Sequence, residues 1–198
     1  MRKSLEQRVA ELEKKMNEIT GNNVVKIGKQ LGVGDTFELA DLTWKILDIT
    51  DKGHMCLAER LDNSMRFDAN SNDWRKSSLR EHLNGSFFTR LSEAVGENNI
   101  IPFDRDLLSL DGQTEYGACE DKVSLLTVDE YRKYRSLIPN DDSWWWLITP
   151  WSTPCNGYET LVAVVSSSGD IRSNCCDGYG GVRPVCIFPS AIFESGDK

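Results

Sequence analysis

The chain has 198 residues and a formal net charge of −8, with 39% hydrophobic and 27% charged residues. So acidic a chain lacks the basic surface that nucleic acids and anionic membranes require, and we expect neither as a partner. No stretch approaches the roughly 18 apolar residues of a membrane span, and the charged start MRKSLEQRVAELEKK is unlike a signal peptide. We therefore expect one globular domain with a short appendage.

The first twenty residues carry a heptad-like pattern. Their apolar positions are spaced 4, 3, 4 and 3 residues apart, like the a and d positions of a coiled coil, and comprise Leu5, Val9, Leu12, Met16 and Ile19. We predict an oligomerisation helix over residues 1–20, favouring a homotrimer, and a lead-in over 21–34. The alternative is an amphipathic helix docked on its own domain, because so short a heptad run is ambiguous.

Residues 35–190 combine strand and helix patterns, and residues 191–198 form a tail. Alternating apolar residues predict two strands within 36–49, and a further strand follows at 54–61. Helices are expected at 74–83, ending at Asn84-Gly85, at 87–95, and from Thr127 to Tyr134, where Thr127 and Glu130 fit a capping box. A hairpin at 161–173 and a strand at 181–188 complete an α+β domain.

Residues that could carry chemistry are scarce. The two histidines, His54 and His82, are not part of a recognised catalytic motif. The six cysteines include no C-x-x-C pair, and we expect them to be free thiols. We predict no catalytic residue, no metal site and no cofactor.

An ordered set of short motifs marks the domain. It comprises Trp44-Lys45-Ile46-Leu47-Asp48, Trp74-x-x-Ser77-x-Leu79-Arg80-x-x-Leu83-Asn84-x-x-Phe87, Val123-Ser124-Leu125-Leu126-Thr127-x-x-Glu130, Trp145-Trp146-Leu147-x-x-Pro150, Ser168-Gly169-Asp170-Ile171 and Gly181-Val182-Arg183-Pro184. Over residues 24–190 the set resembles a bacterial and phage family of unknown function with a C-type-lectin-like fold, related to formylglycine-generating enzymes. This chain has Ile148 and Thr149 where that family usually has Arg-Ser. The copper-binding cysteine pair of the enzymes has no match, so the resemblance does not imply their activity.

Some proteins of this fold are the variable proteins of diversity-generating retroelements, which mutate adenines. Randomised Asn codons cannot become Lys, Gln, Met, Glu or Trp codons. From Ser152 to Phe188 the chain has no Lys, Gln, Met or Trp and one Glu, Glu159, yet it holds four of the six cysteines. We interpret residues 148–188 as a candidate variable region. The alternative is a Gly- and Ser-rich hairpin that avoids long side chains.

The resemblance implies a non-enzymatic recognition protein whose partner is a protein or glycan surface. We expect Trp145 or Trp146 in the core, Arg183 in a structural role, and recognition on loops and strand faces between Ile148 and Tyr179. The predicted ligand-binding residues are Trp151, Asn156, Tyr158, Ser167, Arg172, Asn174, Asp177 and Tyr179. The protein would be a phage-tail or displayed binder on a virion. The alternatives are a cytoplasmic ligand sensor or scaffold and an enzyme of the formylglycine-generating type.

Overall fold

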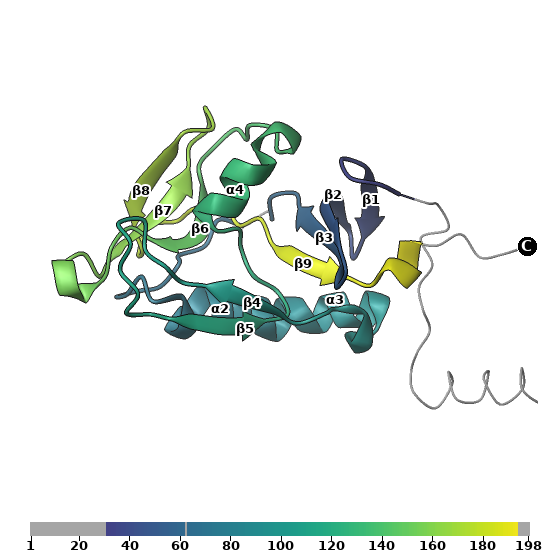
Figure 1. Ribbon diagram of the computed structural model, residues 1–198, viewed down its shortest axis with the longest axis horizontal. Helices are drawn as coiled ribbons and strands as arrows, with labels where there is room; N and C mark the ends of the chain where they lie inside the picture. Colours follow the sequence, from purple (N-terminus) through teal and green to yellow (C-terminus); the bar gives the residue numbers. More distant parts are fainter. Residues whose placement is uncertain (1–30, 62, 194–198) are drawn as a thin grey trace, which may run out of the picture.

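The computed structural model describes residues 31–61 and 63–193, which form a mixed α+β domain. The predicted coiled-coil helix at 1–20 and most of the lead-in lie outside these residues. Within the described part of the chain, the strands form three small antiparallel sheets (Figure 1). The expected α+β class is confirmed.

The first sheet joins the start of the domain to its end. It contains β1 (Thr36–Leu39), β2 (Leu42–Thr50), β3 (Gly53–Ala58) and β9 (Val185–Phe188), in the order β1-β2-β3-β9. The alternation in 36–49 thus forms two strands, as predicted. The last strand lies beside β3, where Cys56 is opposite Cys186. Both thiols are fully buried, so these two cysteines act as small apolar core residues.

A helical run follows the first sheet and lies along the lower side of the molecule in Figure 1. It consists of η1 (Trp74–Lys76), α2 (Ser78–His82), the π-helical turn η2 (Leu83–Phe87) and α3 (Phe88–Val95). The prediction that the first helix ends at Asn84-Gly85 is wrong, because a π-helical turn carries the chain through. The Asn84 amide donates to the carbonyl oxygens of Arg80 and Val123, at 3.2 and 2.8 Å. Asn84 therefore does not end the helical run; its side chain joins the run to Val123.

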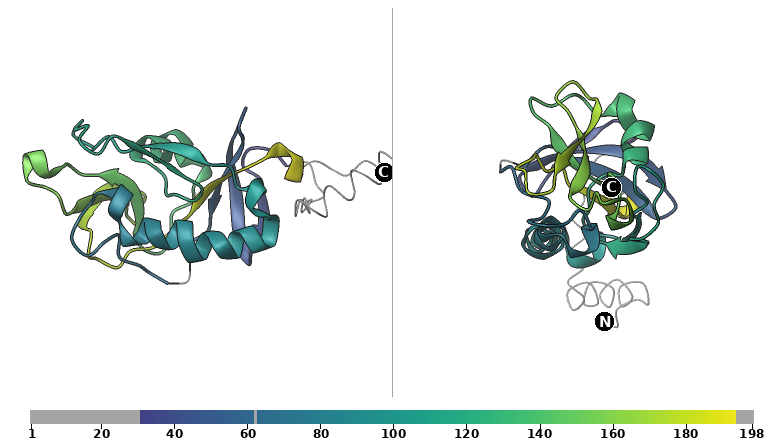
Figure 2. Two further views of the ribbon diagram at one scale, coloured as in Figure 1. Left: turned by 90° about the horizontal axis from the view of Figure 1, so that it is seen from below. Right: turned by 90° about the vertical axis from the view of Figure 1, so that its left-hand side faces the viewer.

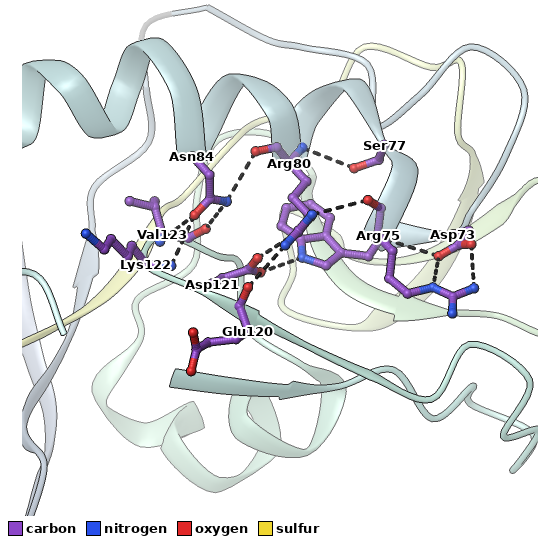
Figure 3. A network of polar contacts seen from close by, with 10 residues as sticks. Asp73, Arg75, Ser77, Arg80, Asn84, Glu120, Asp121, Lys122 and Val123 are labelled. Carbon is purple, nitrogen blue, oxygen red and sulfur yellow. Dashed lines mark hydrogen bonds and ion pairs between the residues drawn. The ribbon is translucent and has the colours of Figure 1, made fainter. Parts of the chain in front are cut away.

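Asp121 holds the same helical run against the second sheet (Figure 3). That sheet pairs β4 (Phe103–Asp106) with β5 (Ala118–Asp121). The fully buried Asp121 carboxylate accepts hydrogen bonds from Trp74 Nε1 at 2.7 Å and from Arg80 Nε at 2.6 Å. The sequence motif that contains Trp74, Arg80 and Asn84 therefore has a structural explanation.

Helix α4 (Val128–Tyr134) begins with the predicted capping box, in which Thr127 and Glu130 bond each other's backbone N–H groups. Glu130 also pairs with the guanidinium of Arg105 at 2.6 Å, and Arg105 is 2% exposed. This pair fixes α4 to β4. Short 3₁₀ turns complete the helical segments at η3 (Glu97–Asn99), η4 (Arg135–Leu137), η5 (Pro154–Asn156) and η6 (Ser190–Phe193).

The third sheet contains β6 (Trp145–Pro150), β7 (Leu161–Val165) and β8 (Ile171–Cys175), in that order. It separates two hydrophobic clusters, with Trp146 in one and Trp145 in the other. Trp146 is fully buried and its Nε1 donates to the Met65 carbonyl at 2.8 Å. The prediction of a core tryptophan with a backbone-bonded N–H is confirmed.

Two further predictions concern the core: the role of Arg183 and the limits of the domain. Arg183 is 8% exposed, donates to the Ala58 carbonyl and lies over the Trp145 ring, so its structural role is confirmed. The core also extends past the expected limits of 35 and 190. Leu31, Ile192 and Phe193 are all buried within it.

Candidate functional site

The late loops, comprising residues 151–160 and 166–180, lie at one end of the molecule. In Figure 1 the sheet β6-β7-β8 and the loops leaving it occupy the left end, whereas the described chain starts and stops on the right. Figure 2 gives the same arrangement from below. A surface at the left end therefore faces away from residues 31 and 193.

Most of the predicted binding residues point into solvent. Six of the eight are exposed: Asn156, Tyr158, Ser167, Arg172, Asp177 and Tyr179. The two tyrosines are 53% and 62% exposed, which is high for large aromatic side chains. Asn174 and Trp151 are half-buried. Trp151 is less open than expected, and its backbone N–H bonds the Leu161 carbonyl at 2.9 Å at the start of β7.

The predicted recognition interval from Ile148 to Tyr179 is too broad. Ile148, Thr149 and the stretch from Val162 to Val165 are buried, because β6 and β7 are covered on both faces by the two clusters. The candidate variable region 148–188 likewise ends in β9, which is buried throughout. Within residues 148–188, only the late loops, the second of which includes β8, expose side chains.

Asn72 fixes the backbone of the first late loop. Its side chain is fully buried, and Nδ2 lies 2.8 Å from the Ser152 and Leu161 carbonyls and 3.0 Å from that of Tyr158. Tyr116 donates to Oδ1 of the same amide at 2.7 Å. Burial, followed by nearby acidic charges, raises the pKa of Tyr116 to about 12, so this donor stays protonated. The loop conformation is thus set by groups outside the loop.

Asp111 provides a second attachment for this loop. Its carboxylate accepts hydrogen bonds from the Ser109 hydroxyl, from Ser152 Oγ at 2.6 Å and from Asn156 Nδ2 at 2.8 Å. These bonds, led by those from the two serines, lower the pKa of Asp111 to about 2. The start of the loop is therefore held to the chain after β4 by a carboxylate that is ionised at neutral pH.

The part of the second late loop that follows β8 is held by backbone groups of residues 65–68. The Cys176 carbonyl accepts from the N–H groups of Phe67 and Asp68, both at 3.0 Å, and Met65 forms a bridge with Gly180. Tyr179 remains outside these bonds, with the Arg66 guanidinium 4.8 Å from its ring centre. Backbone bonding of this kind does not depend on which side chains the loop carries.

The predicted residues fall into separate groups. Trp151, Asn156 and Tyr158 belong to the first loop, and Arg172, Asn174, Asp177 and Tyr179 to β8 and the second loop. Ser167 lies apart, at the turn between β7 and β8. Backbone bonds join the two groups, since the Cys176 N–H donates to the Thr160 carbonyl at 2.7 Å.

The adjacent cysteines differ in environment. Cys175 is exposed, whereas Cys176 is buried and burial raises the pKa of its thiol to about 11. All six cysteines are free in the structure, as predicted. Among residues 31–61 and 63–193, no three His, Cys, Asp or Glu side chains are arranged to hold a metal ion. No helix of this part of the chain is long and apolar enough to cross a membrane.

Sequence reasoning missed the residues that position the loops, chiefly Asn72, Tyr116, Asp111 and Arg66. The Asn72 side chain bonds carbonyls 80, 86 and 89 positions away, and nothing in the local sequence signals such partners. Composition could have drawn attention to Asp111, which stands in the polar turn Asp111-Gly112.

No curated protein and no solved structure matched the chain. Residues 107–190, which contain both late loops, match the model of a domain of unknown function, DUF6273.

Proposed function

We propose that this protein is a non-enzymatic recognition protein that binds a protein or glycan surface through its late loops. Its fold would be C-type-lectin-like, and a diversity-generating retroelement would vary the loop side chains. The chain would be displayed as a homotrimer through residues 1–20, on a phage tail or a similar carrier.

The proposal rests on one observation: the residues that hold the main chain of the late loops are different from the residues whose side chains the loops expose. Asn72, Tyr116 and the backbone of residues 65–68 hold the loop main chain. The outward side chains of Tyr158 and Tyr179 make no side-chain hydrogen bond within the described residues. Side chains at such positions can change without loss of the fold, which a diversified binding surface requires.

The composition of the exposed surface also favours recognition. Rigid aromatic side chains supply contact area at low entropic cost, and Ser, Asn and Asp supply adaptable hydrogen bonds, as in antibody paratopes. Several copies of one weak site would gain affinity through avidity. The placement of the loops opposite residues 31 and 193 leaves them free to face a partner if the chain is attached by either end.

Two display libraries would test the scaffold. One randomises the eight predicted positions, and the matched library randomises eight buried positions of β6, β7 and β9. We expect most members of the first library to resist protease and most of the second to be degraded. The first should also yield binders when selected on immobilised lysozyme and on glycan-coated beads. Equal protease sensitivity of the two libraries would overturn the proposal.

Direct binding tests the natural loops. The purified chain would be applied to a glycan array and to a panel of intact bacterial strains, with the Trp151→Ala/Tyr179→Ala double variant as comparison. We expect a bound target to be lost in the variant. Sequencing of the DNA around the gene tests the retroelement separately. A template copy should differ from the codons of residues 148–188 only at positions where the template has adenine.

A further inference from the structure

An open surface cavity of about 480 Å³ lies away from the late loops, between the β1–β2 turn, residues 61 and 63–65, and the helical run 82–90. Its apolar lining consists of Leu42, Leu61, Met65 and Phe87. Leu42 and Phe87 are almost fully buried, whereas Leu61 and Met65 are half-buried. The volume and the mixed lining are typical of a site for a small organic ligand.

Two unusual backbone segments border this cavity. The β1–β2 turn places Ala40 at φ 52° and Asp41 at φ 60°, a left-handed conformation that costs a residue with a Cβ atom about 1 kcal/mol. On the other side, η2 (Leu83–Phe87) is a π-helical turn, a rare feature that occurs often at functional sites. The left-handed pair is what a two-residue turn between antiparallel strands requires, and η2 also places Leu83 and Phe87 in the core. Both segments contribute residues to the lining of the same cavity.

The polar rim is formed by Asp41 and Asn63 on one side and by His82, Ser86 and Arg90 on the helical side. His82 Nδ1 and Ser86 Oγ are 3.1 Å apart. Burial, and then the charge of Arg90, lowers the pKa of His82, so the imidazole is neutral at pH 7. The pair therefore offers neutral hydrogen-bonding groups beside the Arg90 cation.

Arg90 is placed to bind an anion next to the apolar lining. Its guanidinium carbon lies 5.2 Å from the centre of the Phe87 ring. Within the described residues it forms no ion pair and no hydrogen bond, so its fork of N–H donors is available to a carboxylate. Asp41 bears the opposite charge at the rim and disfavours a ligand with a second negative group.

We propose that this cavity binds a small amphipathic monocarboxylate. The carboxylate pairs with Arg90 beside His82 and Ser86, and the apolar body covers Met65, Leu61 and Leu42. The cavity shares no lining residue with the late loops. Ligand binding at this cavity therefore does not depend on the proposed recognition function of the late loops.

Titration of the full chain with octanoate, followed by ¹H–¹⁵N NMR, tests the site. We expect saturable shifts at residues 41, 65 and 82–90. Arg90→Gln should weaken binding about tenfold, because it removes a charge-assisted bidentate pair. The matched variant Arg132→Gln removes an exposed arginine of α4 and should bind like the parent.

Two uncharged or cationic analogues of octanoate test the role of the carboxylate, and a second variant tests the position of the site. 1-Octanol and octylamine should bind at least several-fold more weakly than octanoate, and Ser86→Trp should block the cavity. Thermal melts of both variants verify that they are folded. The proposal is overturned if millimolar octanoate causes no saturable shift, if 1-octanol binds equally well, or if Arg132→Gln weakens binding as much as Arg90→Gln.

Discussion

Two asparagines that contact the first late loop, one outside it and one within it, have different roles. Asn72 is fully buried, and its amide bonds three carbonyls of the loop and the Tyr116 hydroxyl. Asn156 is exposed and makes one side-chain bond, to Asp111. The same side chain therefore fixes the loop through several buried bonds at one position and adds a single exposed bond at the other. The difference comes from burial, since a buried amide must be fully bonded and an exposed one need not be.

Trp146 and Trp151 should give the largest contrast. Trp146→Ala should lower the free energy of unfolding by about 4 kcal/mol, because it empties a fully buried ring site and removes the hydrogen bond to the Met65 carbonyl. Trp151→Ala should cost about 1 kcal/mol, because that ring is half-buried. Urea unfolding followed by circular dichroism measures both. Similar losses for the two variants would mean that Trp151 belongs to the core.

Asn72→Ala should cost about 3 kcal/mol, because it leaves several buried polar groups without partners. Asn156→Ala is the matched control and should change the free energy of unfolding by less than about 0.5 kcal/mol. Hydrogen exchange should also rise across residues 152–161 in the first variant only. If exchange there is unchanged in Asn72→Ala, the loop is held by something other than this amide.

Protonation of Asp111 at low pH should weaken the attachment of the first late loop. The pKa of this carboxyl is lowered from 3.8 to about 2, so its contribution to stability is complete above pH 4 and is lost as the pH falls toward 2. Melting temperatures of the parent and of Asp111→Asn, recorded from pH 6 to pH 2, should differ most at pH 6 and converge at pH 2. We expect a smaller effect than for Asn72, because Asp111 is exposed. A difference that does not depend on pH would contradict this role of the charge.

The smallest effects are expected where the late loops meet solvent. Tyr158→Ala and Tyr179→Ala should each change the free energy of unfolding by less than about 0.5 kcal/mol. Tyr179 contacts Arg66, but an exposed cation–π contact contributes little. Chemical unfolding measures both variants. A loss above about 2 kcal/mol for either would show that its side chain supports the fold.

Local sequence patterns predicted most elements because their causes are local. The alternation in 36–49, the capping box at Thr127 and the Ser-Gly-Asp turn of the β7–β8 hairpin each depend on residues a few positions apart. The helix end at Asn84-Gly85 failed because the Asn84 amide bonds Val123, which is 39 positions away. The buried pair of Arg105 and Glu130 was missed for the same reason.

The amino-acid sequence alone determined the α+β class, the positions of the turns and which aromatic residues are apolar enough to enter a core. It also marked residues 148–188 by their composition, whereas the structure showed which of them are exposed. Only the tertiary structure decided that Asn72 and Asp111 hold the first late loop, and that the β1–β2 turn and the helical run border an open surface cavity. The physical reason is that a buried polar side chain or a cavity is defined by partners from distant parts of the chain, and their meeting depends on the packing of the whole domain.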